Sequence, residues 1–436
     1  MDLTNVFRSP NIGSGIGTNF AQAPYRIPAN FPGAGLTEDR FSAQNSRLGI
    51  RIDAPVWGGQ AIGYLETDFL GNAPTNLSTT SNSAVLRLRV FFVDYTKNKW
   101  EIMGGQDWSM LTPNRVGINP IPGNIFFSQD VDTNYQVGLV WERVPQFRFI
   151  YHASKIATFG LSVENADQYL GGNGGVGTPV IPAALTGTSA FSTGQFDTGA
   201  SATNIPNVAP DVIVKAAFDP MINKRAFHFE VSGLYKTFRA NTYMPPASGN
   251  SGGTSINDTK SGGGISANIN FELFKNFHLI GNSFWSDGGG QKIFDLAPDV
   301  VIHPQANSTS AFTISPLHSM SGIGGAEWQV KPKLGFYGYY GGVYVSKDSF
   351  ACGASFCGYG VPYTATTVAI AESQNRVIQE GTVGFVPVFW RSPNYGALQL
   401  MTQYSYLSRA PWSVPVGTPR IAHGSMFFIN LRYVLP

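Results

Sequence analysis

The chain has 436 residues, a net charge of +2 at pH 7, and equal shares of 13% charged and 13% aromatic side chains. The charged share is about half of the roughly 25% found in soluble domains, and so small a net charge excludes a strong electrostatic case for a nucleic-acid partner. The mean hydropathy is -0.05, and no apolar run reaches the about 20 residues of a transmembrane helix, so a closed β-barrel is the remaining way to cross a bilayer.

Alternating apolar and polar residues, the pattern of strands with one apolar face, recur from Arg40 to the end of the chain. The pattern predicts fifteen strands, at about 41–53, 60–70, 84–95, 99–109, 134–152, 156–164, 211–218, 226–239, 263–273, 277–286, 320–330, 334–346, 376–390, 396–408 and 421–435. In the last one, Phe427 and Ile429 share a face, while Asn430 and Arg432 lie on the other. Such strands fit a barrel with lipid outside and water inside, but a soluble propeller or sandwich shows the same alternation.

The connections between strands favour the barrel. They alternate between short turns, at 96–99, 274–276, 331–333 and 391–394, and long stretches, at about 71–83, 110–133, 165–210, 240–262, 287–319 and 347–375. Short turns at one rim and long loops at the other are typical of outer-membrane barrels, whereas a propeller repeats a blade of constant length. The sequence therefore predicts an all-β fold, a transmembrane antiparallel β-barrel of the porin type, in the bacterial outer membrane.

The connection at about 111–133 is expected to fold into the barrel. It holds three Pro and two Gly, but also the apolar cluster Ile125-Phe126-Phe127, which an outward solvated loop would not need. We predict that it constricts the lumen. The residues expected at the narrowest point are Arg115, Asp130 and Asp132 on the loop, facing Arg47, Arg87 and Arg89 on the wall.

Charged side chains on the predicted inner faces are the candidate pore-lining residues. On the wall they are Arg47, Arg51, Glu66, Asp68, Arg87, Arg89, Asp107 and Arg148. In the third strand, for example, Leu88 and Val90 are predicted to face lipid, and Arg87 and Arg89 to face water. These residues could form cross-strand ion pairs worth about 0–1 kcal/mol each, or an arginine ladder that attracts anions, and both interpretations can hold at once.

The sequence contains little that points to catalysis or to a bound cofactor. Cys352 and Cys357 lie five residues apart, a spacing that allows a loop disulfide in an oxidising compartment, with two free thiols as the alternative. No P-loop, nucleophile elbow or HExxH pair is present, and the six histidines are scattered singly. We expect no cofactor and no metal, and a barrel enzyme remains only the third hypothesis.

The odd number of predicted strands leaves the barrel one strand short. The strand at 41–53 ends in a short turn and the strand at 421–435 follows a long loop, so the two run the same way and cannot pair antiparallel. We therefore expect most of a first strand to be missing, with residues 1–8 as its stub and a gap between those two strands. The expected domains are an N-terminal stub with an external loop at 1–40, and a single barrel at 41–436.

Several short motifs follow one another in the first 165 residues. They are Arg40-Phe41, Ser46-Arg47-Leu48-Gly49, Glu66-Thr67-Asp68-Phe69, Leu86-Arg87-Leu88-Arg89, Gly105-Gln106-Asp107-Trp108-Ser109, Pro145-Gln146-Phe147-Arg148 and Ser162-Val163-Glu164-Asn165. Their order and spacing resemble the DcaP-like trimeric porins of Gram-negative outer membranes. The resemblance implies a sixteen-stranded barrel, a homotrimer, and diffusion of small hydrophilic solutes, with small organic anions such as dicarboxylates favoured in some members.

By motif position, Arg47, Arg87, Arg89 and Arg148 correspond to the family's strand-borne arginines, and the segment after Trp108 corresponds to its in-folded loop. The chain departs from the family by ending in Leu-Pro where an aromatic residue is common, and by lacking the family's coiled-coil segment and first strand. The leading hypothesis is a porin without enzymatic activity, a passive channel with a weak preference for anions, held in outer-membrane lipid as a homotrimer. The alternative is a substrate-specific channel for small organic anions.

Overall fold

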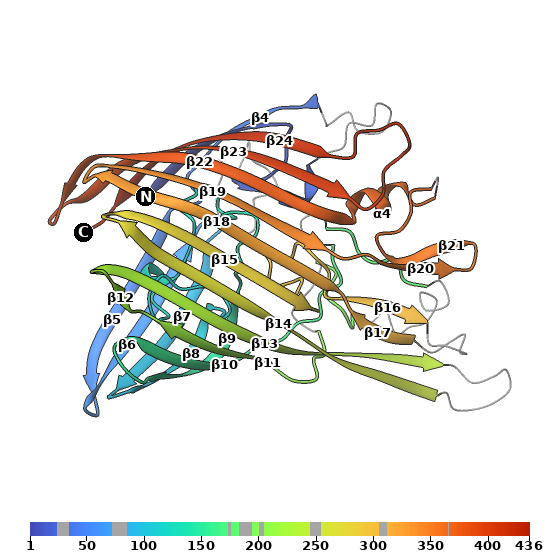
Figure 1. The fold of residues 1–436 in the computed structure, drawn as a ribbon, viewed down its shortest axis with the longest axis horizontal. Helices are drawn as coiled ribbons and strands as arrows, with labels where there is room; N and C mark the ends of the chain where they lie inside the picture. The colour runs from blue at the N-terminus through green and yellow to red at the C-terminus, as the bar shows by residue number, and fades with distance from the viewer. Residues whose placement is uncertain are drawn as a thin grey trace.

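A computed structural model describes residues 1–23, 35–71, 85–172, 176–182, 194–199, 205–244, 254–304, 312–364 and 366–436. Nearly all of its regular structure belongs to one antiparallel sheet that curves around the interior (Figure 1). The strands of this sheet are β1 (Asp2–Ser9), β4 (Glu38–Ser42), β5 (Arg47–Val56), β6 (Gly59–Asp68), β7 (Arg87–Lys97), β8 (Trp100–Trp108), β9 (Arg143–His152), β10 (Ala157–Glu164), β11 (Asp211–Phe218), β12 (Met221–Ile222), β13 (Arg225–Met244), β14 (Thr254–Phe274), β15 (Phe277–Asp287), β18 (His318–Lys331), β19 (Leu334–Val345), β22 (Asn375–Ser392), β23 (Gly396–Pro411) and β24 (Ala422–Val434).

The remaining elements are short and lie in the connections. They are the hairpins β2–β3 (Gly13–Ser14 and Gly17–Thr18), β16–β17 (Val300–Pro304 and Phe312–Pro316) and β20–β21 (Asp348–Cys352 and Ser355–Tyr359), the 3-10 helices η1 (Phe20–Gln22) and η3 (Pro122–Asn124), and the helix α4 (Val368–Ser373). No helix among the described residues has the length and apolarity needed to span a membrane.

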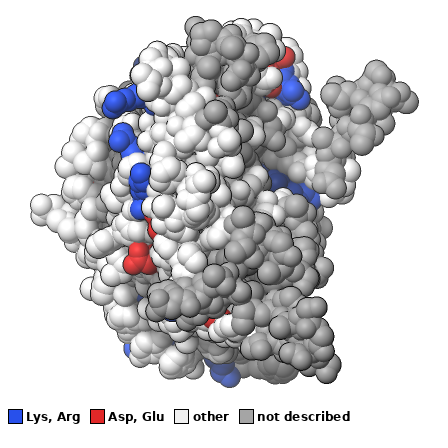
Figure 2. Space-filling view, turned by 90° about the vertical axis from the view of Figure 1, so that its right-hand side faces the viewer, with Lys and Arg blue, Asp and Glu red and all other residues white. Residues whose placement is uncertain are grey.

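The topology of the sheet agrees with the predicted antiparallel barrel. It contains eighteen strands, but β4 with β5, and β11 with β12, are each two parts of one interrupted wall strand, which leaves sixteen wall strands. Tight turns join the strands at one end, with positive φ at Asn98 and Asn276, a conformation that Asn tolerates better than most residues. The long connections lie at the opposite end, at the right of Figure 1. Figure 2 views this end, where charged side chains are few and scattered.

Side chains alternate across the wall as predicted. On β5, Leu48 and Ile52 point outward and are 56% and 65% exposed, while on β24 Phe428 and Asn430 point inward and are fully buried. One strand breaks the predicted phase: Val90 on β7 is fully buried instead of facing lipid. The register of β6 against β7 shifts between residues 66 and 67, and this β-bulge turns the rest of β7 by one position.

The first strand fills only part of the expected gap. β1 pairs with β24 from Asp2 to Ser9 and with β4 from Thr4 to Arg8, so the predicted gap is wrong for the half of the wall nearer the long loops. In the other half, β5 pairs with β6, and no described residue pairs with its opposite edge.

At least three of the described connections fold into the barrel instead of outward. The first is the segment between β8 and β9 (109–142), which was expected to form a constriction. The second is the segment after β15 (288–299), which was expected to be an external loop. Both contribute to the buried core. Residues 10–23, expected as part of an external loop, also lie inside, because Ile12 and Phe20 pack in the same core cluster as Leu111 and Val131. The remaining part of that expected loop, 24–34, lies outside the described residues. The predicted strand at 134–152 begins only at Arg143.

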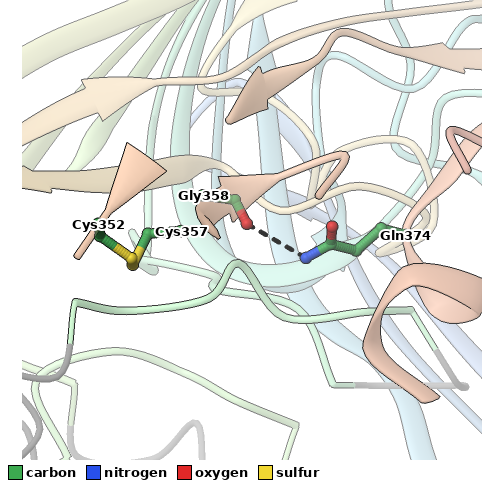
Figure 3. The surroundings of a disulfide bond; sticks show 4 residues. All are labelled: Cys352, Cys357, Gly358 and Gln374. Atoms are coloured by element: carbon green, nitrogen blue, oxygen red, sulfur yellow. Dashed lines mark hydrogen bonds between the residues drawn. A yellow bond between two sulfur atoms is a disulfide. The ribbon is translucent and has the colours of Figure 1, made fainter. Parts of the chain in front are cut away.

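The two cysteines lie at the long-loop end. Cys352 and Cys357 form a disulfide across the β20–β21 hairpin, with their Cα atoms 5.8 Å apart. Gln374, just before β22, fastens this hairpin to the wall (Figure 3): its Nε2 donates to the carbonyl of Gly358 at 3.2 Å, and its Oε1 accepts from the amide of Gly360 at 2.7 Å. The disulfide therefore closes an external hairpin and not a strand of the wall.

Candidate pore constriction

The in-folded segment 109–142 is held by side chains of the wall that accept its backbone N–H groups. The acceptors are Glu164 for Met110 (2.8 Å), Glu230 for Asn114 (3.1 Å), Asp219 for Gly117 (3.1 Å), Gln403 for Val131 (2.5 Å) and Glu380 for Val137 (3.0 Å). Asp219 directly follows β11, beside a tight turn, so the segment reaches from the long-loop end almost to the short-turn end. These bonds fix its path through contacts to the main chain, and they are charge-assisted where the acceptor is an ionised carboxylate.

On the opposite side of the lumen, β6 and β7 bring four of the predicted residues together. Arg87 forms two parallel bonds to Asp68, at 3.0 and 2.7 Å, and Arg89 contacts both Glu66 (2.5 Å) and Asp68 (2.8 Å). Asp68 and Arg89 are almost completely buried. The ion-pair interpretation therefore describes Arg87 and Arg89 well, because both guanidiniums already have carboxylate partners.

Tyr135 is the loop residue that faces these arginines. Its hydroxyl lies 3.5 Å from Nη2 of Arg47 and 3.4 Å from Nη2 of Arg89, and its ring stacks on Phe127 at 4.7 Å between centroids. Burial alone would raise the pKa of Tyr135, but the charges of Arg47 and Arg89 outweigh burial and lower the pKa below its ordinary value. Its φ of 59° is rare for an aromatic residue, so the loop holds the ring in place against backbone strain.

Arg143 is the charged residue of the site that the sequence pattern missed, in addition to the aromatic residues Trp108, Tyr135 and Trp141. Its guanidinium lies 5.1 Å from the centre of the Trp108 ring, its Nη1 is buried without a hydrogen-bond partner, and no carboxylate among the described residues forms an ion pair with it. Alternation back from Arg148 assigns Arg143 to the outer face. Arg143 is the first residue of β9, where the chain leaves the interior, and the alternation of inward and outward side chains does not yet hold there.

A cavity of about 350 Å³ opens beside these residues. Its lining combines guanidiniums, aromatic rings and amides: Arg87, Leu88, Arg89, Gln106, Trp108, Thr133, Asn134, Tyr135, Trp141, Glu142, Arg143, Val144, Gln291, Phe294 and Asp295. Trp141 packs against Trp108, Tyr135 and Phe294, so the aromatic rings form one continuous surface. Such a surface beside guanidiniums can hold a solute that has both an apolar part and negative charge.

Several predicted pore-lining residues lie elsewhere. Arg51 forms two bonds to Asp53 on its own strand, and both side chains are half-exposed in the short-turn half of the lumen. Asp107 and Arg148 form an ion pair of 3.2 Å, and Arg148 also donates to the carbonyl of Trp108. Asp107 and Arg148 are almost completely buried in this ion pair, and neither lines the cavity beside Tyr135.

The predicted loop residues also lie away from the arginines. Arg115 bonds through both terminal nitrogens to Glu327 of β18, at 2.8 and 2.7 Å. Asp130 and Asp132 are absent from the lining of the cavity that Tyr135 shares with Arg87 and Arg89, so they do not face these arginines as predicted. Arg115 faces β18, Asp132 faces residues 10–23 through its bond to Thr18, and Tyr135 takes their expected place beside the arginines. Among the described residues, no group of three or more His, Cys, Asp or Glu side chains is arranged to hold a metal ion.

No protein-family model matches the chain, and no curated protein is significantly similar to it in sequence. Among solved structures, the outer membrane channel DcaP of Acinetobacter baumannii is similar over 98% of this chain and 94% of that chain, with a TM-score of 0.63 and 16% identity. The fold is that of a bacterial outer-membrane porin. An anion-selective porin from Comamonas acidovorans is similar over 99% of this chain and 96% of that chain, with a TM-score of 0.50 and 12% identity. At these identities the likeness to other porins shows the fold alone.

Proposed function

We propose that this protein is an outer-membrane porin, a passive diffusion channel for small hydrophilic solutes with a weak preference for anions. The observation that carries the proposal is that the charges of Arg47 and Arg143 are not paired with a carboxylate among the described residues. Both guanidiniums act on the Tyr135 side chain at the constriction, and neither forms an ion pair with a carboxylate among the described residues. A fixed cation in a narrow, partly dry passage raises the local concentration of anions.

Arg47 and Arg143 carry the proposed selectivity, and Arg87 and Arg89 contribute less to it. Both are neutralised by Asp68 and Glu66, so their charges act over a shorter range than that of an unpaired guanidinium. Arg47 and Arg143 have no such partner, and their field reaches a passing solute. The preference remains weak because carboxylates such as Glu142 and Asp295 also line the cavity.

The test is the reversal potential of the channel in a planar bilayer with a salt gradient. The double variant Arg47→Gln/Arg143→Gln should lower the anion-to-cation permeability ratio by roughly twofold or more, because it removes both unpaired charges. Arg51→Gln removes a charge paired with Asp53 and serves as the control, with a smaller change expected. An unchanged reversal potential in the double variant rejects the selectivity role, and a purified protein without conductance rejects the channel.

A substrate-specific channel for small organic anions is the second candidate, and the cavity of about 350 Å³ favours it. The continuous surface of Trp108, Tyr135 and Trp141 beside Arg143 offers a solute both stacking and charge. Current block by millimolar concentrations of one carboxylate, with no block by chloride or glucose, would support it over a general porin.

The proposed assembly is a homotrimer in outer-membrane lipid, as in the family that the sequence resembles. Native mass spectrometry of the detergent-extracted protein tests this directly. A mass of three chains is the expected result, and a single chain at all concentrations contradicts it.

A further inference from the structure

Three buried carboxyl groups lie near enough to one another for their charges to interact, where the in-folded segment contacts the far wall. Asp130 and Asp132 belong to the segment and Glu380 to β22, and the three are 7%, 2% and 1% exposed. None forms an ion pair among the described residues, and each has one oxygen buried without a hydrogen-bond partner. We call these three residues the carboxyl cluster.

The carboxyl cluster also contains the bonds that fasten the segment. Glu380 accepts the amide of Val137 at 3.0 Å through Oε2, and its carbonyl accepts from Nε2 of Gln136 at 2.9 Å. Asp132 accepts the amide of Thr18 at 3.2 Å and so ties residues 10–23 to the same place. Two of the in-folded segments therefore meet at the cluster.

Few cations face the cluster to balance it. The titratable and charged groups around it are Arg8 on β1, Arg115 on the segment, Glu327 on β18, and Tyr337 and Tyr339 on β19. Arg8 contacts Glu38 at 3.1 Å, and Arg115 is bound to Glu327 at 2.7 Å. The charge of Arg8 also acts on Asp132, but this one shared cation cannot balance three ionised carboxylates at the same place.

We propose that the carboxyl cluster is a proton-dependent latch, which holds residues 128–137 against β19, β22 and β23 while its carboxyls are protonated and releases them when the carboxyls ionise. The inference rests on the proposed function, because the latched segment carries Tyr135 to the constriction. Protonation removes the negative charge from the unpartnered oxygens, which are costly to keep ionised when they are buried without a hydrogen-bond donor. Ionisation adds mutual repulsion at a site that water does not reach.

The protonation of the segment's own carboxyls agrees with this geometry. Burial raises the pKa of Asp130 to about 8, with the charges of Asp132 and Glu327 adding to the rise against a hydrogen bond from Ser128. Burial also raises the pKa of Asp132, although the charge of Arg8 opposes it. The latched state thus binds more protons than the released state. Its relative stability therefore falls as the pH rises from the ordinary carboxyl range toward about 8.

Single-channel recordings at about pH 5 and about pH 9 test the latch, since these values bracket the titration of raised carboxyls. The wild-type channel should show a larger or more often open conductance at the higher pH. Asp130→Asn/Glu380→Gln carries neutral side chains of the same size and should lose the pH response. Asp53→Asn removes an exposed lumen carboxylate far from the cluster and should keep it.

A double variant that responds to pH as the wild type does overturns the latch. If the double variant fails to assemble, Asp130→Asn alone should still weaken the response. Hydroxyl-radical footprinting of residues 128–137 does not depend on conductance, and it should show greater oxidation at the higher pH in the wild-type protein. Equal oxidation at both pH values overturns the latch, whereas a protein that responds to pH but never conducts contradicts only the proposed function.

Discussion

Along β6 and β7, the charged side chains of the inner wall bond to one another, as Arg89 does to Glu66 and Asp68. Along β18 and β22, the wall carboxylates bond instead to the in-folded segment, as Glu327 does to Arg115 and Glu380 to the amide of Val137. The two sides use the same residue types. The partner decides the outcome: pairing within the wall leaves space beside it for a passage, while pairing with the loop closes that side of the lumen.

The side of the lumen that the in-folded segment closes, here called the packed side, should depend on its buried cations for most of its stability. Lys292 contacts both Glu142 and Asp211, the latter at 2.9 Å, and is 1% exposed. Lys292→Met should lower the free energy of unfolding by about 3–5 kcal/mol, because it leaves two buried carboxylates without their cation. Urea unfolding in detergent, followed by circular dichroism, measures the change.

The matched control is Lys260→Met at the long-loop end of β14, where an exposed lysine lies 3.8 Å from Asp258. Its expected change is within about 0.5 kcal/mol. Equal stability of the two variants would contradict the view that buried pairs anchor the packed side.

On the other side of the lumen, here called the open side, arginines with a carboxylate partner should contribute more to stability than arginines without one. Arg89→Gln leaves Glu66 and Asp68 short of a partner in a buried place and should cost about 1–3 kcal/mol of unfolding free energy. Arg143→Gln removes a guanidinium with no carboxylate partner and should cost no more than about 1 kcal/mol, the contribution of its contact with Trp108. The same unfolding assay compares them, and a larger loss in Arg143→Gln would reverse the assignment.

The wall of this barrel could be predicted from sequence because its signal is local. Each strand needs only the alternation of its own residues, so Leu48, Ile50 and Ile52 already mark the outer face of β5. The exceptions are places where the backbone leaves that period. The β-bulge on β7 moved Val90 inward, and the start of β9 turned Arg143 into the lumen.

The path of the in-folded segment could not be predicted from sequence. Apolar residues between prolines indicated that it enters the barrel, but its course depends on partners far away in the chain. Val131 donates to Gln403, 272 residues later, and Val137 donates to Glu380, 243 residues later. Because these acceptors bind backbone amides, most of the loop's own side chains carry no signal of where it goes, and Asp130 and Asp132 were misplaced for this reason. Arg115, which bonds to Glu327, is an exception.

The ring of Tyr135 should limit the passage between the two sides. Tyr135→Ala removes the ring that stacks on Phe127 and faces Arg47, so it should raise single-channel conductance by roughly half or more. Tyr135→Phe keeps the stack and loses only the hydroxyl, so its conductance should stay close to the wild-type value. If Ala and Phe give the same conductance as the wild type, the narrowest point lies elsewhere.

The smallest effect on conduction is expected from the disulfide, which belongs to neither side of the lumen. Cys352 and Cys357 close the β20–β21 hairpin at the long-loop end, and Gln374 holds the base of that hairpin independently of the sulfur bridge. Reduction should release at most about 2 kcal/mol of local chain restraint and speed proteolysis of the hairpin, without changing conductance or reversal potential. Cys352→Ser/Cys357→Ser should behave as the reduced protein does and should not respond to reductant. If reduction changes the conductance of the wild-type protein but not that of this variant, the hairpin reaches the passage. The passage would then be bounded by the hairpin as well as by the β6–β7 wall and the in-folded segment.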